Sequence, residues 1–124
     1  MKQIPNNKQY DLEERTKNFA RDCRYFVNKL PKTLSNIEDI RQLVRSSGSI
    51  AANYIEANEA LSKKDFIMRV KICKKESKET CLWLRLIDVA GDLELEKQRQ
   101  QIFEESFQLM KIFGAIIEKT KKAS

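Results

Sequence analysis

Histidine is absent from this sequence of 124 residues, and glycine and proline are rare, with three and two residues respectively. Without an imidazole the chain lacks the most common general base and the most common metal-binding side chain of proteins. It also has no glycine-rich phosphate loop, and Ser46, Ser47 and Ser49 have no histidine to activate them. We therefore expect no catalytic site, and we expect the protein not to be an enzyme.

The metal-binding residue types are equally sparse. Three cysteines lack the CxxC spacing typical of zinc sites: Cys23, Cys73 and Cys81. Each falls on an apolar side of a predicted helix, where a free thiol packs as a small hydrophobic group, so we expect them to be buried and reduced. Glu56, Glu76 and Glu79 are reminiscent of di-iron bundles, but those sites pair Glu-x-x-His motifs. The sequence predicts neither a metal nor a cofactor.

Long apolar runs are missing as well. No segment approaches the roughly 20 apolar residues that a membrane-spanning helix requires. The first residues, MKQIPNNKQYDLEER, contain no apolar signal-peptide segment. On this basis we expect a cytoplasmic protein that does not associate with membranes.

The composition that remains favours helices. Charged residues make up 34% of the chain, and β-branched residues form no alternating runs. Apolar residues recur at steps of three and four, which predicts helices over about residues 11–30, 36–60, 63–90 and 95–119, followed by a frayed tail at 120–124. Four such helices with short connections predict an all-α fold, an antiparallel up-down-up-down four-helix bundle, with residues 1–124 forming a single domain.

Positive charge is concentrated in the third predicted helix. Residues 62–87 hold eight Lys or Arg against three Asp or Glu, which accounts for five of the six net positive charges. At 100° per residue, five of these cations share one side of the helix: Lys71, Lys74, Lys75, Lys78 and Arg85. Such a row can follow phosphates without reading sequence, so these residues are candidate contacts to RNA or DNA. A plain solvated face and a site for an acidic protein partner are the alternatives.

Two other surfaces lack the charges of an ordinary solvated face. The side of the second helix opposite its apolar stripe is mostly small and includes Gly48, which is either tolerated or marks a close backbone approach. One flank of the third helix carries Trp83 among acidic and apolar residues. We expect these faces to support a homo-oligomer, or a polar network that fixes register. The candidate residues are Arg45, Ser49, Asn53, Glu56, Glu76, Glu79 and Trp83. Solvation of the same side chains is the alternative.

The segment SIAANYIEANEALSKKDF, residues 49–66, and the segment KICKKESKETCLWL, residues 71–84, together resemble one bacterial family. Its members are four-helix-bundle proteins first noticed as reading frames in intervening sequences of 23S ribosomal RNA genes, and the similarity covers about residues 15–120. The usual Asn-x-x-Glu-Gly ends here in Ala57 instead of glycine. The resemblance implies an antiparallel bundle, a ring-like homo-oligomer (a pentamer) and no established activity. A fold and charge similarity to a pentameric accessory protein of diversity-generating retroelements also implies nucleic-acid binding. A protein-interaction adaptor is the alternative.

Overall fold

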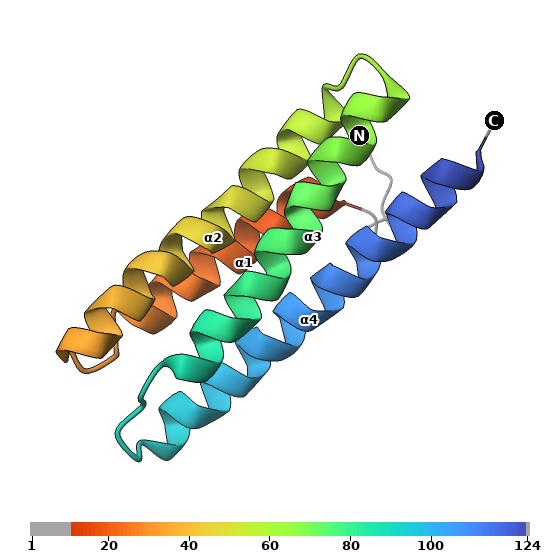
Figure 1. The fold of residues 1–124 in the computed structure, drawn as a ribbon. Coiled ribbons are helices and arrows are strands. Elements are labelled where there is room, and N and C mark those ends of the chain that lie inside the picture. Colours follow the sequence, from red (N-terminus) through yellow and green to blue (C-terminus); the bar gives the residue numbers. More distant parts are fainter. Residues whose placement is uncertain (1–10, 124) are drawn as a thin grey trace.

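The computed structural model describes residues 11–123 and consists of four helices joined by short connections (Figure 1). They are α1 (Leu12–Val27), α2 (Leu34–Asn58), α3 (Lys63–Leu86) and α4 (Leu93–Lys122). Each helix packs on the next in the chain, and α4 also touches α1, where the contact is sparsest. The described part contains no strand. Residues 1–10 and Ser124, which belong to the predicted domain and tail, lie outside the described residues.

The helices are antiparallel, because their cross-helix contacts run in opposite numerical order. Along the α2 side of the α2–α3 interface, Asn36 contacts Asp88, Ser46 contacts Thr80, and Asn53 contacts Arg69. The residue numbers thus rise on the α2 side while they fall on the α3 side. The numerical order is likewise opposite between α3 and α4 and between α1 and α4. This confirms the predicted all-α, up-down-up-down bundle.

All four helices begin with an N-cap residue of a favoured type, whose side chain accepts a hydrogen bond from a backbone amide of the first turn. Asp11 accepts from the Glu14 amide at 3.2 Å, and Ser62 accepts from the Asp65 amide at 3.0 Å. The cap of α2 is Thr33, and this helix begins at Leu34, two residues before the predicted start at residue 36. Asn36 is instead fully buried.

The other helix ends also differ from prediction. The predicted ends at residues 30 and 90 were wrong because Leu30, Ile87 and Val89 are buried apolar residues of the connections, not of helices. They extend the apolar pattern while closing the ends of the core. Conversely, α4 begins at Leu93 and stays helical to Lys122, so most of the predicted frayed tail is ordered helix. Basic residues in this last turn suit the negative end of the helix dipole.

The core is apolar at its centre and hydroxyl-rich between α2 and α3. Its largest fully buried apolar side chains are Phe19, Phe26, Phe113, Leu43, Ile50, Leu84, Ile87, Leu109 and Val70. Ser46 belongs to the core, 2.7 Å from the Thr80 hydroxyl, although its position on the helix predicted the opposite face. Two residues of the predicted α2 stripe, Ile37 and Ile55, are exposed instead. Small hydroxyls that bond within the core allow α2 and α3 to pack closely.

The cysteines and Gly48 have specific surroundings. Cys23 and Cys73 are fully buried, whereas Cys81 is only partly buried; all three are free thiols. Burial raises the pKa of Cys23 and of Cys73 to about 12. At Gly48 an added Cβ would lie 3.2 Å from the guanidinium of Arg24, so the close neighbour is a flexible side chain and not a helix backbone.

Candidate nucleic-acid interface

Charges on α3 are sorted by sign across the helix. Glu76 is buried on the side facing α2, where the Arg45 guanidinium donates to its carboxylate at 3.3 and 3.4 Å. Glu79 lies 3.6 Å from the same guanidinium. Arg45 thus contacts both acidic residues in the middle of α3, on a different side of the helix from Lys74 and Lys78.

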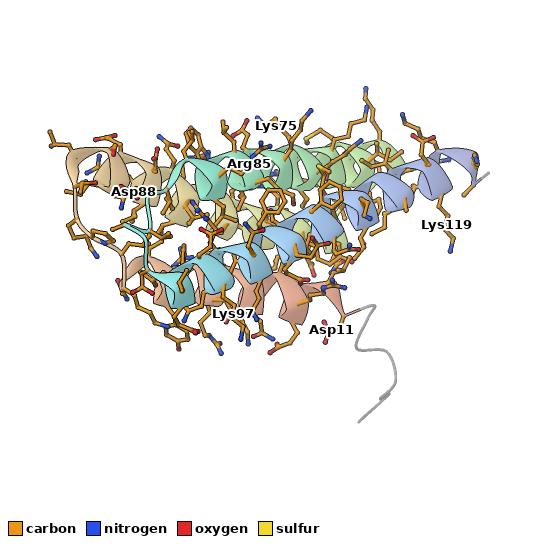
Figure 2. The ribbon with its side chains drawn as sticks, turned by 90° about the horizontal axis from the view of Figure 1, so that it is seen from below. Asp11, Lys75, Arg85, Asp88, Lys97 and Lys119 are labelled. Carbon is orange, nitrogen blue, oxygen red and sulfur yellow. The ribbon has the colours of Figure 1, made fainter. Side chains whose placement is uncertain are left out.

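The five predicted cations, Lys71, Lys74, Lys75, Lys78 and Arg85, form what we call the basic face. All five are exposed, and within residues 11–123 none has a carboxylate oxygen within 4.0 Å. They extend over about 21 Å of helix at 1.5 Å per residue. Figure 2 shows Lys75 and Arg85 on one side of the bundle and Lys97 on the other. The structure therefore places all five predicted residues on one continuous surface.

The basic face reaches the border with α4. The Lys74 side chain lies along Gly114, with its Cε and Nζ each 3.7 Å from the position of an added Cβ. Arg85 lines a hollow of about 260 Å³ together with Arg99, Gln100 and Phe103. The Arg99 guanidinium is already occupied, since it donates to the carbonyls of Leu84 and Ile87 and to Glu96. Arg85, by contrast, has no carboxylate partner in the part of the chain that the structure describes.

Two residues of this border were missed from the sequence. Phe107 is 37% exposed, and its ring lies parallel to that of Phe103 within 6°, with centroids 6.4 Å apart. The Lys111 ammonium lies 4.9 Å from the centroid of the Phe107 ring. Phe103 itself is half-buried and packs against the core. The sequence does indicate that these residues lie together: Phe103, Phe107 and Lys111 follow one another at steps of four and so share a side of the helix.

The predicted polar network forms in part, between α2 and α3. Arg45 joins Glu76 and Glu79 as described above. Separately, the Asn53 amide donates to the Ser49 carbonyl at 2.9 Å and to its hydroxyl at 3.0 Å, while its oxygen accepts from Arg69 at 3.0 Å.

Two of the predicted interface residues stay outside this network. Glu56 is exposed and makes none of these contacts. Trp83 is partly buried against the core, and its Nε1 is buried without an acceptor among the described residues. Three large apolar side chains lie exposed on the outer surface of α3: Met68, Leu82 and Leu86. By their helical angles, Met68 and Leu86 lie between Glu79 and the basic face, whereas Leu82 lies among the cations of that face.

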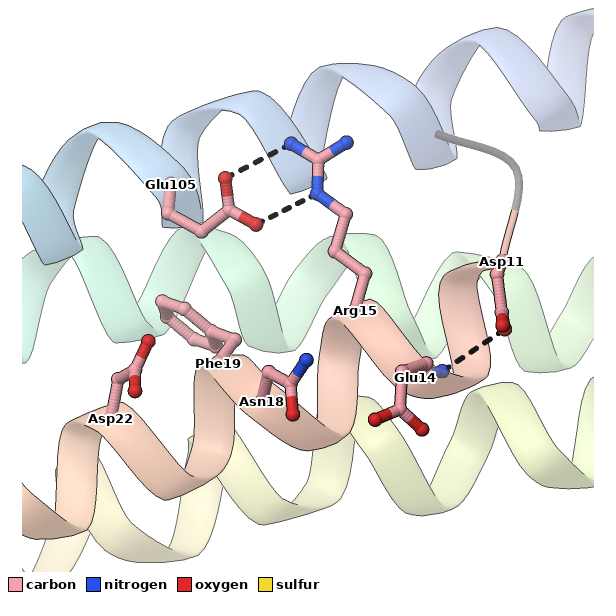
Figure 3. A pocket seen from close by; sticks show the side chains of 7 residues that line it. All are labelled: Asp11, Glu14, Arg15, Asn18, Phe19, Asp22 and Glu105. Carbon is pink, nitrogen blue, oxygen red and sulfur yellow. Dashed lines mark hydrogen bonds and ion pairs between the residues drawn. The ribbon is translucent and has the colours of Figure 1, made fainter. Parts of the chain in front are cut away.

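A separate groove lies between α1 and α4, where these helices are least closely packed (Figure 3). It encloses about 710 Å³. The Arg15 guanidinium spans it, donating to both carboxylate oxygens of Glu105 at 2.7 and 2.9 Å. Three further carboxylates line it, from Asp11, Glu14 and Asp22. This acidic groove holds none of the residues predicted to be functional. Arg15 and Glu105 satisfy each other, and none of the described residues that line the groove carries a hydroxyl or a thiol.

None of the described helices combines the length and the hydropathy needed to cross a bilayer. Among residues 11–123, no three metal-binding side chains of the His, Cys, Asp or Glu type come together. The molecule is a helical bundle whose most distinctive surface is a row of unpaired cations.

Comparison with known proteins places this bundle in a family. The family model of the 23S rRNA-intervening sequence protein matches residues 8–115, so the chain belongs to that family, as the sequence predicted. A similar solved structure is that of a protein with unknown function from the S23 ribosomal protein family of Bacteroides thetaiotaomicron VPI-5482. It is 30% identical, with a TM-score of 0.69 over 85% of this chain and 96% of that one. The comparison with curated proteins gave no match.

Proposed function

We propose that this chain is a non-enzymatic, self-assembling bundle that binds RNA or DNA through the basic face without reading sequence. One observation carries the proposal: five exposed cations share one side of α3, and no carboxylate of residues 11–123 pairs with them. Lysine and arginine at such positions neutralise phosphates and release condensed counterions. Contacts of this type position a backbone without selecting a sequence.

Self-assembly is supported by the exposed apolar side chains of α3. Met68, Leu82 and Leu86 are 43%, 48% and 54% exposed, and they lie within a few turns of one another. Covering them with a second copy would remove apolar surface from water. A homo-oligomer, such as the pentamer that the family resemblance suggests, would also repeat the basic face and raise affinity through multivalency. The same apolar residues support the competing candidate, an adaptor that binds another protein.

The proposal is tested by the salt dependence of binding to labelled RNA and DNA. Replacing Lys74 and Lys78 together with Gln should reduce the log–log salt slope by roughly one to two units, since each phosphate contact contributes about 0.7 on single strands and about 0.9 on duplex DNA. The matched control replaces Lys97 and Lys119, exposed lysines of α4 away from the basic face (Figure 2). Arg99 would be a poor control because it holds the end of α3.

Three outcomes would argue against the proposal. Equal losses from both double variants would mean that net charge, not a site, drives binding. An absence of binding even at low salt would favour the adaptor. A monomeric mass by light scattering at micromolar concentration would refute self-assembly.

A further inference from the structure

A row of aromatic and basic side chains on α4 runs beside the basic face. The row consists of Phe103, Phe107 and Lys111, one helical turn apart. Two contacts fix the side of α4 on which it lies. Phe103 shares a hollow with Arg85, and Gly114, further along the same side, lies against the stem of Lys74. The row therefore follows the α3–α4 border from the level of Arg85 to that of Lys74.

The two rings of this row are arranged in parallel. Phe103 and Phe107 are inclined by only 6°, at a centroid separation of 6.4 Å. That separation is about twice the 3.4 Å rise between stacked nucleotides of one strand. Phe107 is the more exposed ring, and the ammonium of Lys111 lies 4.9 Å from its centroid. A contact of this kind at an exposed site is weak, so Lys111 can turn toward a phosphate and uncover the ring.

The hollow of about 260 Å³ at Phe103 has the chemistry that an unstacked base requires. The ring supplies a π-face. The Gln100 amide nitrogen donates to the Glu96 carboxylate at 2.9 Å, which leaves one N–H and the amide oxygen for a base edge. Arg85 has no carboxylate partner among the described residues and can meet the adjoining phosphate. Of the two carboxylates nearby, Glu96 is paired with Arg99, whereas Glu104 is unfavourable: it lies close enough to Cys81 to help burial raise the pKa of that thiol.

We infer that the preferred ligand of the basic face is a single strand of RNA or DNA, whose bases stack on Phe103 and Phe107 while its phosphates follow Lys74, Lys78 and Arg85. This inference rests on the proposed function. In a duplex the faces of the bases are covered by neighbouring pairs, so the two rings would have nothing to stack on. Single strands present those faces, and stacking on aromatic side chains is the usual way in which proteins hold them without reading sequence.

The test compares one oligonucleotide as a single strand and as a duplex of equal length, by fluorescence anisotropy. Phe107→Leu keeps an apolar side chain at an exposed position but removes the π-face. It should weaken single-strand binding by about fivefold or more, in line with alanine substitutions of stacking residues. Duplex affinity and the salt slope should stay unchanged. Glu104→Gln should strengthen binding to both forms, because it removes a repulsive charge.

The outcomes separate the two hypotheses. If wild-type protein binds both forms equally, or Phe107→Leu leaves single-strand affinity unchanged, the stacking inference is wrong while the Lys74 and Lys78 double variant can still support the basic face. If polyglutamate of equal charge displaces the strand as well as oligothymidine does, the face recognises charge alone and the inference is again refuted. If the protein binds neither nucleic acid, the proposed function itself fails. A melting temperature within a few degrees of wild type establishes that the Phe107 variant is folded.

Discussion

Asn36 ties both connections at one end of the bundle together, and its replacement should be costly. The side chain is fully buried. Its amide nitrogen donates to the Pro31 carbonyl and to the Asp88 carbonyl, each at 2.9 Å, and its oxygen accepts from the Asp88 amide at 2.9 Å. The connection before α2 is thereby joined to the connection after α3. Asn36→Ala removes all three hydrogen bonds and leaves three backbone groups without these partners.

The expected loss follows from those three bonds. A typical intramolecular hydrogen bond contributes about 1 kcal/mol net, whereas a buried group left unsatisfied costs about 1–3 kcal/mol. Asp88 is itself exposed, so water can reach part of this site and the lower figure applies. We expect Asn36→Ala to lower the free energy of unfolding by about 3 kcal/mol, a large part of the roughly 5–15 kcal/mol of a typical domain. Asn36→Asp should be no better, because its carboxylate would face two carbonyls.

Urea unfolding followed by circular dichroism measures this loss. Protein concentration must be identical throughout, because self-assembly would couple stability to concentration. The matched control is Asn18→Ala at an exposed position of α1, where we expect a change of no more than about 0.5 kcal/mol. A loss at Asn36 of less than about 1 kcal/mol would show that the three bonds contribute little and that our accounting is wrong.

Two further predictions concern the thiols and the polar network. Burial raises the pKa of Cys23 and Cys73 from 9.0 to about 12, so both thiols resist ionisation only in the folded state. Their contribution to stability is complete below pH 9 and declines as the pH rises toward 12. Iodoacetamide should accordingly react much faster in urea than with native protein, and equal rates would contradict this. In the network, Asn53→Leu should cost about 1 kcal/mol through its lost bonds to Arg69 and its own helix. Glu79→Ala should cost about 0.5 kcal/mol or less, since the pair is half-exposed, and the reverse order in melting experiments would refute this ranking.

Sequence patterns predicted the number, type and order of the helices, because apolar spacing reflects burial directly. Their ends were predicted less well. Leu30 and Val89 are buried in connections, and apolar spacing alone does not distinguish them from helical core residues. Asn36 illustrates a second limit. Asparagine favours N-caps, yet here that role belongs to Thr33, and Asn36 is drawn into the core by Asp88, 52 residues away.

The basic face could be predicted because it lies on one helix, where angular positions follow from residue numbers. Features that depend on how two helices pack against each other could not be predicted from the sequence. Which carboxylates Arg45 would offset depended on the register of α2 against α3. The exposure of Phe107 beside the basic face depended on how α4 is rotated against α3. Angular spacing placed Phe103 and Phe107 on one side of α4, but only the packing revealed that this side borders the cations.

The position of Lys74 against Gly114 has an entropic consequence. A lysine free in solvent loses rotamer freedom when it fixes on a phosphate, and this loss opposes binding by about 0.5–1.5 kcal/mol for each side chain immobilised. Lys74 already has a surface to lie along, since Gly114 leaves room for its stem at ordinary contact distance. Part of its ordering is therefore complete before any ligand arrives. Among the lysines of the basic face, Lys74 should hold a phosphate with the smallest loss of conformational freedom, and a glycine on the neighbouring helix is what preorganises it.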